Sequence, residues 1–414
     1  MIAAHCFGGQ GLADSIDDPL GAFVPGTEVD IAGAEAGPLQ GVRFAAKDIY
    51  DVAGHVTGCG NPDWARSQAP ASDHAWAVRA LLEAGAHLVG KAITDEFAYS
   101  LNGMNHHYGA PTNSNAPGRI TGGSSSGSAS AVAGGAVETA LGSDTGGSVR
   151  IPASYCGLYG IRTTHGRVSL EGVMPLAPTL DTVGWFARDA DLLRRVGDVL
   201  LGADSEASAR PRRLLIAEDA FALADAGVGQ ALAGALQRLE ARFGGGERIR
   251  VGEPGGGLES WVHKLRAILI GEAWLSHGAW IESAKPSLGP EIARNFAAHS
   301  NVSAEDLAAA RADRGTFIEH LSDLLEGPET LLCLPSAPSI APLLSSTSEE
   351  LATQRLRVHS LTCTAGLSGF PQVSLPLGEV EGCPVGLSLI ALAGQDQMLL
   401  SFVETFAREP GEDG

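Results

Sequence analysis

The sequence predicts an α/β fold with a mixed central β-sheet sandwiched between α-helices. Helical and extended patterns alternate along the chain, first at 73–84 and 86–89, then at 214–216 and 228–243. Short apolar runs beside amphipathic helices are typical of layered α/β domains, because each apolar sheet face needs helices to bury it. We therefore expect one domain of this class, covering residues 1–414.

The first predicted helix, 73–84, has a candidate cap and a terminator. Ser72 precedes it, and a serine side chain at this position accepts a hydrogen bond from an unpaired N–H of the first turn. Gly85 follows it and is a typical helix end. The residues expected on its apolar face are Ala75, Val78, Leu81 and Leu82.

Shorter patterns predict further elements of the sheet and its cover. Residues 128–137 are nearly all Ala, Ser, Val and Gly, which favours a helix packed close against neighbouring backbone, and 138–142 is expected to be a strand. Near the carboxyl end, strands are predicted at 372–377 and 386–390, with a closing helix at 397–406.

Between residues 202 and 327 the chain is mainly helical and has few recognisable motifs. Helices are expected at 261–281 and 304–325, and we expect this segment to cover the ligand pocket. Its tryptophans do not all share one helical face; core packing is favoured, with a ligand-facing position for one of them as the alternative. They are Trp261, Trp274 and Trp280.

Composition limits the classes of function. The chain is 44% hydrophobic and 18% charged, which is enough apolar material for a large core. The net charge of −20 disfavours nucleic acid, because such binding depends on cationic contacts to phosphate. No apolar run approaches membrane-spanning length, and no basic segment followed by an apolar one opens the chain. We expect a cytoplasmic protein that does not bind membranes.

Cysteine and histidine patterns do not indicate a metal or a cofactor. The six cysteines contain no Cys-x-x-Cys pair and are expected to be reduced thiols. His106 and His107 are adjacent but have no carboxylate at ligand spacing, so we expect them in a pocket wall or on the surface. The activity is therefore expected to need neither metal nor cofactor.

The most informative stretch runs from residue 122 to 153. It places Ser124 and Ser148 in two Gly-rich loops that one short apolar segment separates. Glycines at 142, 146 and 147 let the backbone approach a small ligand and turn successive N–H groups toward one point. Such a nest of donors favours a developing oxyanion.

This stretch resembles the signature of the amidase signature family, whose members are serine hydrolases with a Ser-Ser-Lys triad. The family also has an upstream lysine in a Lys-Asp context, which residues 42–48, Val-Arg-Phe-Ala-Ala-Lys-Asp, supply. Runs at 57–64, 152–157 and 181–188 are similar too, most of all to the plant amidase 1 branch, whose substrates are indole-3-acetamide and related arylacetamides. The resemblance implies the amidase-signature fold.

The resemblance implies a role for each of three residues. Ser148 is the expected nucleophile that forms the acyl-enzyme, Ser124 relays protons, and Lys47 is the base. In the family the relay serine lies on a cis peptide bond. Ser125 and Ser126 compete for the relay role by proximity alone, and Ser124 is favoured because it has the matching place in the family pattern.

Composition supports Lys47 independently. Only four of the 28 cationic residues are lysines, so arginine is this chain's usual cation. Arginine does not lose its proton in proteins, whereas a buried lysine can be neutral near pH 7. A lysine after an apolar run is therefore expected to be a base, and the alternative is a surface lysine in a strand-to-loop turn.

The loop around Ser148 is expected to form an oxyanion hole. Asp144 and Arg150 flank this loop and are expected to pair across it, holding the donors in place; the alternative has Arg150 binding a substrate carboxylate. Asp48 is expected to bond local backbone, and His165 is not expected in a Ser-His-Asp triad, because no Gly-x-Ser-x-Gly elbow is present. The expected oxyanion donors are the N–H groups of Thr145, Gly146, Gly147 and Ser148.

The function expected from these residues is hydrolysis of a small-molecule carboxylic amide to the acid and ammonia. One alternative is the glutamine-hydrolysing subunit of a tRNA-dependent amidotransferase, which acts with a partner. Another is a catalytically silent receptor-type module, which the presence of all three triad residues disfavours. A homodimer is an expectation from the family alone.

Overall fold

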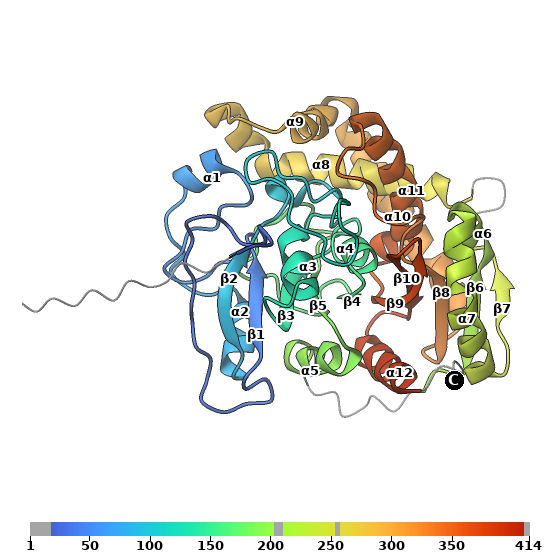
Figure 1. Ribbon diagram of the computed structural model, residues 1–414. Helices are drawn as coiled ribbons and strands as arrows, with labels where there is room; N and C mark the ends of the chain where they lie inside the picture. Colours follow the sequence, from blue (N-terminus) through green and yellow to red (C-terminus); the bar gives the residue numbers. More distant parts are fainter. Residues whose placement is uncertain (1–17, 203–209, 253–256, 410–414) are drawn as a thin grey trace, which may run out of the picture.

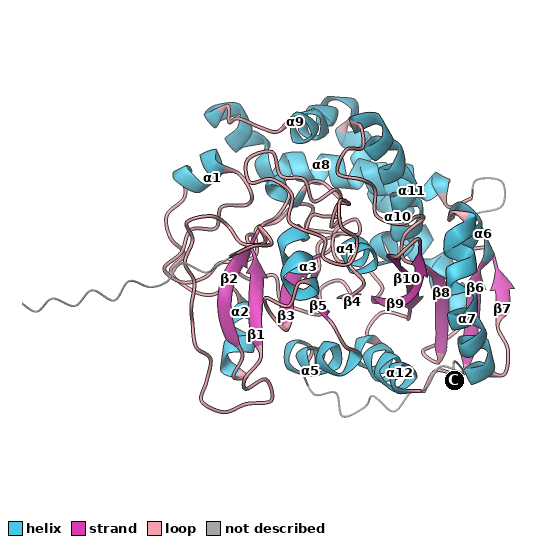
Figure 2. Ribbon diagram, in the orientation of Figure 1, coloured by secondary structure: helices cyan, strands magenta, loops and turns pink. Residues whose placement is uncertain are grey.

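The computed structural model describes residues 18–202, 210–252 and 257–409. A mixed sheet forms the centre of the molecule and helices cover it on both faces (Figure 1, Figure 2). The predicted α/β class is confirmed. The expectation that no basic segment followed by an apolar one opens the chain concerns residues 1–17, which lie outside the described ones. Among the described helices, none combines the length and the apolar character needed to cross a bilayer.

The described part of the chain contributes ten strands in the order β2-β1-β3-β5-β4-β9-β10-β8-β6-β7. β1 is parallel to β2 and β3, and β6 is parallel to β7 and β8. The strands from β3 through β5, β4, β9 and β10 to β8 pair antiparallel. The bounds are β1 Arg43–Lys47, β2 His87–Ala92, β3 Thr139–Ser143, β4 Tyr159–Arg162, β5 Val183–Ala187, β6 Arg213–Ala217, β7 Glu247–Ile249, β8 Thr330–Pro335, β9 Gln372–Val380 and β10 Cys383–Ile390.

Helices lie on both faces of the sheet. α2, α5, α7 and α12 pack on one face, and α3 and α4 on the other. α8, α9 and α11 lie together along the upper edge in Figure 1. The bounds are α1 Pro62–Ser67, α2 Trp76–Glu83, α3 Ser126–Ala133, α4 Arg150–Tyr155, α5 Ala190–Leu200, α6 Glu218–Leu223, α7 Ala226–Phe243, α8 Glu259–Ala284, α9 Pro290–Ala297, α10 Ala304–Leu325, α11 Ser348–Ser368 and α12 Asp396–Arg408, with short 3₁₀ turns η1 Glu96–Ala98 and η2 Ala298–Asn301.

Apolar side chains alternate between the two faces of the central strands. Ala140 and Phe186 belong to the cluster that packs on α3, whereas their neighbours Leu141 and Trp185 belong to the cluster that packs on α5. Successive strand residues point to opposite faces, so burial on both faces needs continuous apolar runs. A Cβ on Gly142 would lie 2.9 Å from the Phe186 ring, which explains why glycine is needed at this contact.

The first predicted helix begins later than expected. α2 starts at Trp76, and Ser72 is not its cap, because the Ser72 hydroxyl bonds to the adjacent aspartate side chain instead. The N–H of Trp76 donates to the carbonyl of Glu171, a contact between distant segments that keeps the preceding residues extended. The small-residue helix α3 also ends early, at Ala133, because the chain turns through Gly135 with a φ of +78°.

Residues 202–327 contribute two kinds of structure. The described residues up to Ile249 add β6 and β7 to the sheet, with α6 and α7 beside them. The remainder forms α8, α9 and α10, which pack with α11. The pocket-covering part of this segment is therefore its second half, and the single domain over 1–414 stays a prediction.

Candidate active site

The carboxyl ends of β1 and β3 bring the predicted site residues to one edge of the sheet. Lys47 ends β1 and Ser143 ends β3. Ser124 comes just before α3, which packs on both strands, and Ser148 lies in the loop from β3 to α4. Because the carboxyl ends of neighbouring parallel strands meet at one edge, loops far apart in sequence converge there.

Lys47 and Ser124 are directly hydrogen bonded. The Nζ atom of Lys47 lies 2.6 Å from Ser124 Oγ and 2.8 Å from Ser143 Oγ. Ser124 is completely buried, and its peptide bond with Gly123 is cis, as the family resemblance implied. Ser143 was not predicted, because nothing in the sequence distinguishes it from other strand serines.

Burial lowers the pKa of Lys47 from its usual 10.5 to about 7. The side chain is completely removed from solvent, which disfavours the charged form of the amine. The nearby carboxylates of Asp95, Asp144 and Asp181 act in the opposite direction, because negative charge favours the ammonium. The result is an amine that exchanges its proton near neutral pH.

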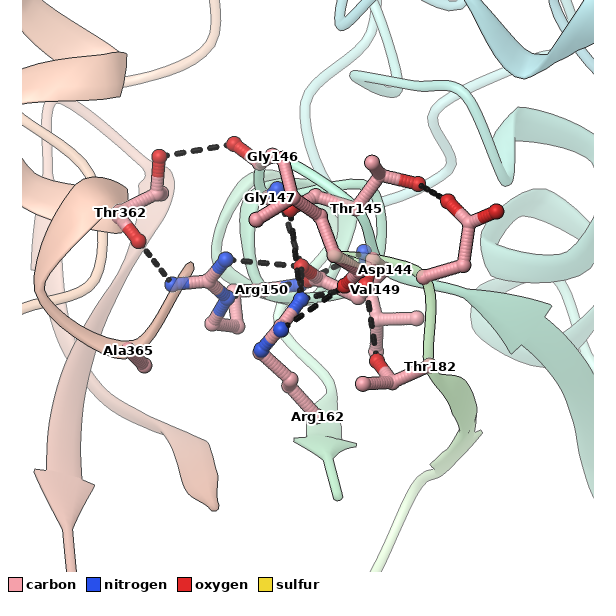
Figure 3. Close-up of polar contacts among 12 residues, drawn as sticks. Asp144, Thr145, Gly146, Gly147, Val149, Arg150, Arg162, Thr182, Thr362 and Ala365 are labelled. Carbon is pink, nitrogen blue, oxygen red and sulfur yellow. Dashed lines mark hydrogen bonds and ion pairs between the residues drawn. The ribbon is translucent and has the colours of Figure 1, made fainter. Parts of the chain in front are cut away.

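Asp144 anchors the loop that carries Ser148 (Figure 3). Its carboxylate accepts hydrogen bonds from the N–H groups of Gly147 and Val149, each at 3.0 Å. Arg150 adds two parallel bonds to the same carboxylate, from Nε at 3.0 Å and Nη2 at 2.7 Å. Burial opposes ionisation, but the Arg150 and Arg162 charges hold the pKa of Asp144 well below its usual range.

All three nitrogens of the Arg150 guanidinium bond to groups of the protein. It is completely buried, and Nη1 donates to the Thr362 carbonyl and to Gln372 Oε1, both at 2.8 Å. The expected pairing with Asp144 is observed, and the alternative that Arg150 binds a substrate carboxylate is wrong, because the group does not reach a cavity. Arg162 on β4 is a second, unpredicted partner, 3.1 Å from Asp144 Oδ1.

One expected oxyanion donor requires correction. The Gly147 N–H donates to Asp144 Oδ1, so it points toward the carboxylate that anchors the loop and not toward a ligand. The loop can make this bond because Gly147 adopts a φ of +128°, which glycine tolerates. Within the described chain, the N–H groups of Thr145, Gly146 and Ser148 have no protein acceptor and remain candidate donors.

Two further segments support the same loop. The hydroxyl of Thr145 donates to Asp181 Oδ1 at 2.6 Å, and the hydroxyl of Thr362 on α11 donates to the Gly146 carbonyl at 2.7 Å. Figure 3 shows these contacts on opposite sides of the loop. Together with Arg162 on β4, these contacts fix the loop by side chains from three distant parts of the sequence. Such support favours preorganised N–H groups.

A cavity lined mainly by apolar residues opens beside Ser148. Part of its wall is formed by residues 99–101, and part by α8 and by residues at the end of α9. The side of α11 that carries Arg355 and His359 was not predicted, because a polar residue inside a helix gives no local sign of facing a cavity.

The three tryptophans pack in the core. Trp261 lies against Phe317 with ring centroids 4.5 Å apart, and Trp274 stacks on His299 at 3.5 Å. Trp280 on α8 packs against the rings of Trp64 and Phe97, with centroids 5.0 Å and 5.7 Å away. None of them lines the cavity beside Ser148, so the favoured core role is confirmed.

Asp48 has a stronger partner than expected. It accepts a hydrogen bond from the Gly58 N–H at 3.2 Å, as a role in local backbone bonding implied. Its Oδ1 also lies 2.9 Å from Nζ of Lys91, and both side chains are buried. This ion pair joins β2 to the loop after β1, and it was not predicted.

The histidines singled out from the sequence have partners within the protein. His106 lines a neighbouring polar cavity, as a place in a pocket wall implied, whereas His107 Nε2 lies 2.8 Å from Glu96 Oε1. His165 contacts the Pro178 carbonyl at 3.0 Å. Within the described ranges, no group of three His, Cys, Asp or Glu side chains is placed to hold a metal ion.

Comparisons with known proteins identify the family of the chain. The family model Amidase matches residues 27–226 and 276–400. Amidase 1 of Arabidopsis thaliana is 41% identical, over 94% of this chain and 99% of that protein. Outer envelope protein 64, chloroplastic, of the same organism is 36% identical, over 89% of this chain and 66% of that protein.

A solved structure described as "Crystal structure of amidase" superposes with a TM-score of 0.79 and 30% identity, covering 89% of this chain and 84% of that one. Fold and relatives together define a hydrolase that acts on amide bonds. The chain belongs to the amidase signature family, and within that family it is similar to plant Amidase 1.

Proposed function

We propose that this protein hydrolyses a small-molecule carboxylic amide to the acid and ammonia through an acyl-enzyme on Ser148. The observation that supports this most directly is the buried 2.6 Å hydrogen bond between Lys47 and Ser124, because Lys47 also bonds Ser143, the residue from which the loop of Ser148 starts. Amide hydrolysis needs an activated nucleophile, a proton acceptor that later donates, and a stabilised oxyanion. Aryl- and indoleacetamides are the substrates that the family resemblance favours.

Acylation begins with the neutral amine of Lys47. Ser148 Oγ attacks the amide carbon while its proton passes to Ser124, and Ser124 passes its own proton to Nζ, which becomes an ammonium. The carbonyl electron pair moves onto oxygen. The proposed donors to this oxyanion are the free N–H groups of the loop, and each such donor is worth about 10²- to 10³-fold in rate.

The tetrahedral intermediate then releases nitrogen. The ammonium of Lys47 returns its proton through Ser124 to the leaving nitrogen, the C–N bond breaks, and an ester on Ser148 remains. Water, deprotonated by the same relay, attacks the ester and releases the acid. Lys47 ends the cycle neutral, and the scheme uses no metal or cofactor.

Ammonia release from phenylacetamide and indole-3-acetamide tests the proposal. We expect activity without added ATP or partner protein, and a fall of at least about 10³-fold in Ser148→Ala. Mass spectrometry after acid quenching should locate the acyl group on Ser148. Ser126→Ala is the matched control, because its hydroxyl contacts the Ile93 carbonyl and not Lys47. Undiminished activity in Ser148→Ala would overturn the proposal.

The two alternatives have their own signatures. An amidotransferase subunit would need ATP and a co-purifying partner for full glutamine hydrolysis. A silent receptor-type module would leave Ser148 unlabelled by a serine-reactive acylating probe. Labelling of Ser148 together with partner-free turnover excludes both.

The proposal includes the surroundings in which the enzyme acts. We propose a cytoplasmic homodimer that takes a small-molecule substrate and binds neither membrane nor nucleic acid. The net charge of −20 supports the absence of nucleic acid binding. Cell fractionation tests the location, and light scattering coupled to size exclusion tests the dimer.

A further inference from the structure

Arg266 on α8 lines the cavity beside Ser148 and has no partner for its charge. Within residues 18–202, 210–252 and 257–409, no hydrogen bond or ion pair reaches its guanidinium, although the side chain is partly buried. The cavity's other arginine, Arg355 on α11, is paired with Glu291 at 2.6 Å. One of the two positive charges in this wall is therefore not compensated.

The electrostatics of the pair make this lack of compensation costly. Burial lowers the pKa of Arg266, and repulsion from Arg355 lowers it further, so the two guanidinium groups are close enough to interact. A partly desolvated charge is unfavourable unless an opposite charge or hydrogen bonds stabilise it. The chain has 48 acidic residues against 28 basic ones, so composition does not explain the missing partner.

His359 adds a neutral polar group to the same wall. It lies one helical turn after Arg355, lines the cavity and is only 5% exposed. Its Nδ1 is buried and has no hydrogen-bond partner among the described residues. A Cβ built on Gly146 would lie 3.5 Å from its Nε2, so the ring stands next to the loop of Ser148. Burial lowers the pKa of His359 to about 3, so the ring is uncharged.

The remaining wall is mainly apolar, with Leu176, Leu269 and Ile270 among its residues. In a pocket of this kind, a few polar groups set the orientation of the ligand. Arg266 is the charged group of this wall that no described residue pairs with, and His359 adds a ring nitrogen without a described partner. A ligand with one reactive amide and one separate acceptor group would place the amide at Ser148 and the acceptor group at Arg266.

We propose that Arg266 binds a carboxylate of the substrate, so that the preferred substrates are amides that carry a second, anionic group. The inference rests on the proposed amidase function and deepens it. A guanidinium fits a carboxylate because its planar fork bonds both oxygens at once. The amide then lies at Ser148, and the carboxylate lies toward α8 on the other side of the cavity. His359 donates to the substrate from α11, between the two ends.

Two matched substrate pairs test this assignment. Adipic acid monoamide is compared with hexanamide, and 4-(carbamoylmethyl)benzoate with 4-methylphenylacetamide, by ammonia release. We expect the wild type to prefer the acidic member of at least one pair. Arg266→Met should lower kcat/KM for that member by roughly 10- to 100-fold, mainly through KM, because a charged hydrogen-bonded contact is lost. Neutral amides should change less than about threefold.

Two variants separate the carboxylate contact from general effects. Lys264→Met removes the same charge from the same helix, at a residue that pairs with Asp313 and does not line the cavity, so substrate preference should not change. Arg266→Lys keeps the charge but loses the fork and should retain part of the preference. Added salt should lower kcat/KM for the acidic substrate more than for its neutral partner.

Two results would overturn the carboxylate contact. One is a wild type that hydrolyses the members of both pairs equally or prefers the neutral ones; the other is an Arg266→Met variant that weakens both members alike. Failure of the proposed function looks different, because then none of the amides is hydrolysed. In that case calorimetric binding of adipic acid monoamide to Ser148→Ala, with and without Arg266→Met, still decides the contact.

Discussion

Lys47 and Lys91 lie on neighbouring parallel strands and are both completely buried, yet their partners differ. Nζ of Lys91 pairs with the Asp48 carboxylate at 2.9 Å and also donates to the Val56 carbonyl at 3.0 Å. Nζ of Lys47 is hydrogen bonded to two serine hydroxyls instead. The same sheet therefore holds a lysine inside an ion pair and a lysine without one.

The comparison teaches that burial alone does not make a lysine a base. Desolvation disfavours positive charge at both positions, but a carboxylate in direct contact offsets that cost at Lys91. A hydroxyl carries no charge and cannot offset it, so the pKa of Lys47 falls to about 7. The nature of the partner atom, more than the depth of burial, separates a structural lysine from a reactive one.

Replacing the unpaired lysine should produce the largest change. In Lys47→Met we expect kcat/KM to fall by about 10³- to 10⁴-fold, because the proton acceptor is lost. The free energy of unfolding should change by no more than about 1 kcal/mol, because no buried carboxylate loses its direct partner. Ammonia release and urea denaturation measure the two effects. Activity within tenfold of the wild type would refute the role of Lys47.

Replacing the paired lysine should have the opposite outcome. Lys91→Met leaves the Asp48 carboxylate buried without its cation, so the free energy of unfolding should fall by about 3–5 kcal/mol. At temperatures where the variant stays folded, kcat/KM should remain within a few-fold of the wild type. Urea denaturation checks the first effect and ammonia release the second.

A second substitution provides the control for the Lys91 variant. Adding Asp48→Asn removes the unpaired charge, so about 1–3 kcal/mol of the lost stability should return. No recovery would show that packing around the lysine stem, and not the charge of Asp48, accounts for the loss.

The smallest expected effect is a shift in the pH dependence of activity. The neutral amine of Lys47 is the active form, so kcat/KM for a neutral amide should fall tenfold per pH unit below about 7. The ionised Asp95 carboxylate favours the ammonium of Lys47, and burial raises the pKa of Asp95 itself to about 7, so the two groups titrate together. Asp95→Asn should therefore lower the pKa of Lys47 and move the acid limb of the profile to lower pH.

A pH–rate profile of both proteins measures this shift. The control is Glu83→Gln on α2, far from the site, which removes the same charge and should leave the acid limb in place. Asn105→Asp is not suitable as a control, because the Asn105 amide bonds two backbone carbonyls and the substitution would break these bonds. An acid limb that moves to higher pH in Asp95→Asn would contradict the electrostatic account of Lys47.

Local patterns predicted much of the fold and part of the candidate site. The helix expected at 304–325 coincides with α10, and the strands at 372–377 and 386–390 lie within β9 and β10. Periodicity is a property of adjacent residues, so it can be read without the fold. Lys47, Ser124 and Ser148 were identified for a similar reason, because each lies in a short, recognisable run.

Residues that act through distant segments were missed. Arg162 reaches Asp144 from β4, and His359 reaches the cavity from the middle of α11. Neither has a neighbour in sequence that indicates its position. The start of α2 was misplaced for a related reason, because a backbone bond from Trp76 to a distant carbonyl outweighs the local capping signal of Ser72.

The amino-acid sequence by itself determined the family, the layered α/β class and the residue types at the candidate site, since all of these depend on short stretches of adjacent residues. Only the tertiary structure decided other pairings of charge: Lys91 with Asp48, Arg162 with Asp144, and Arg266 with no described residue. The physical reason is that pairing depends on distances of a few ångströms between segments that the fold, and not the chain order, brings together.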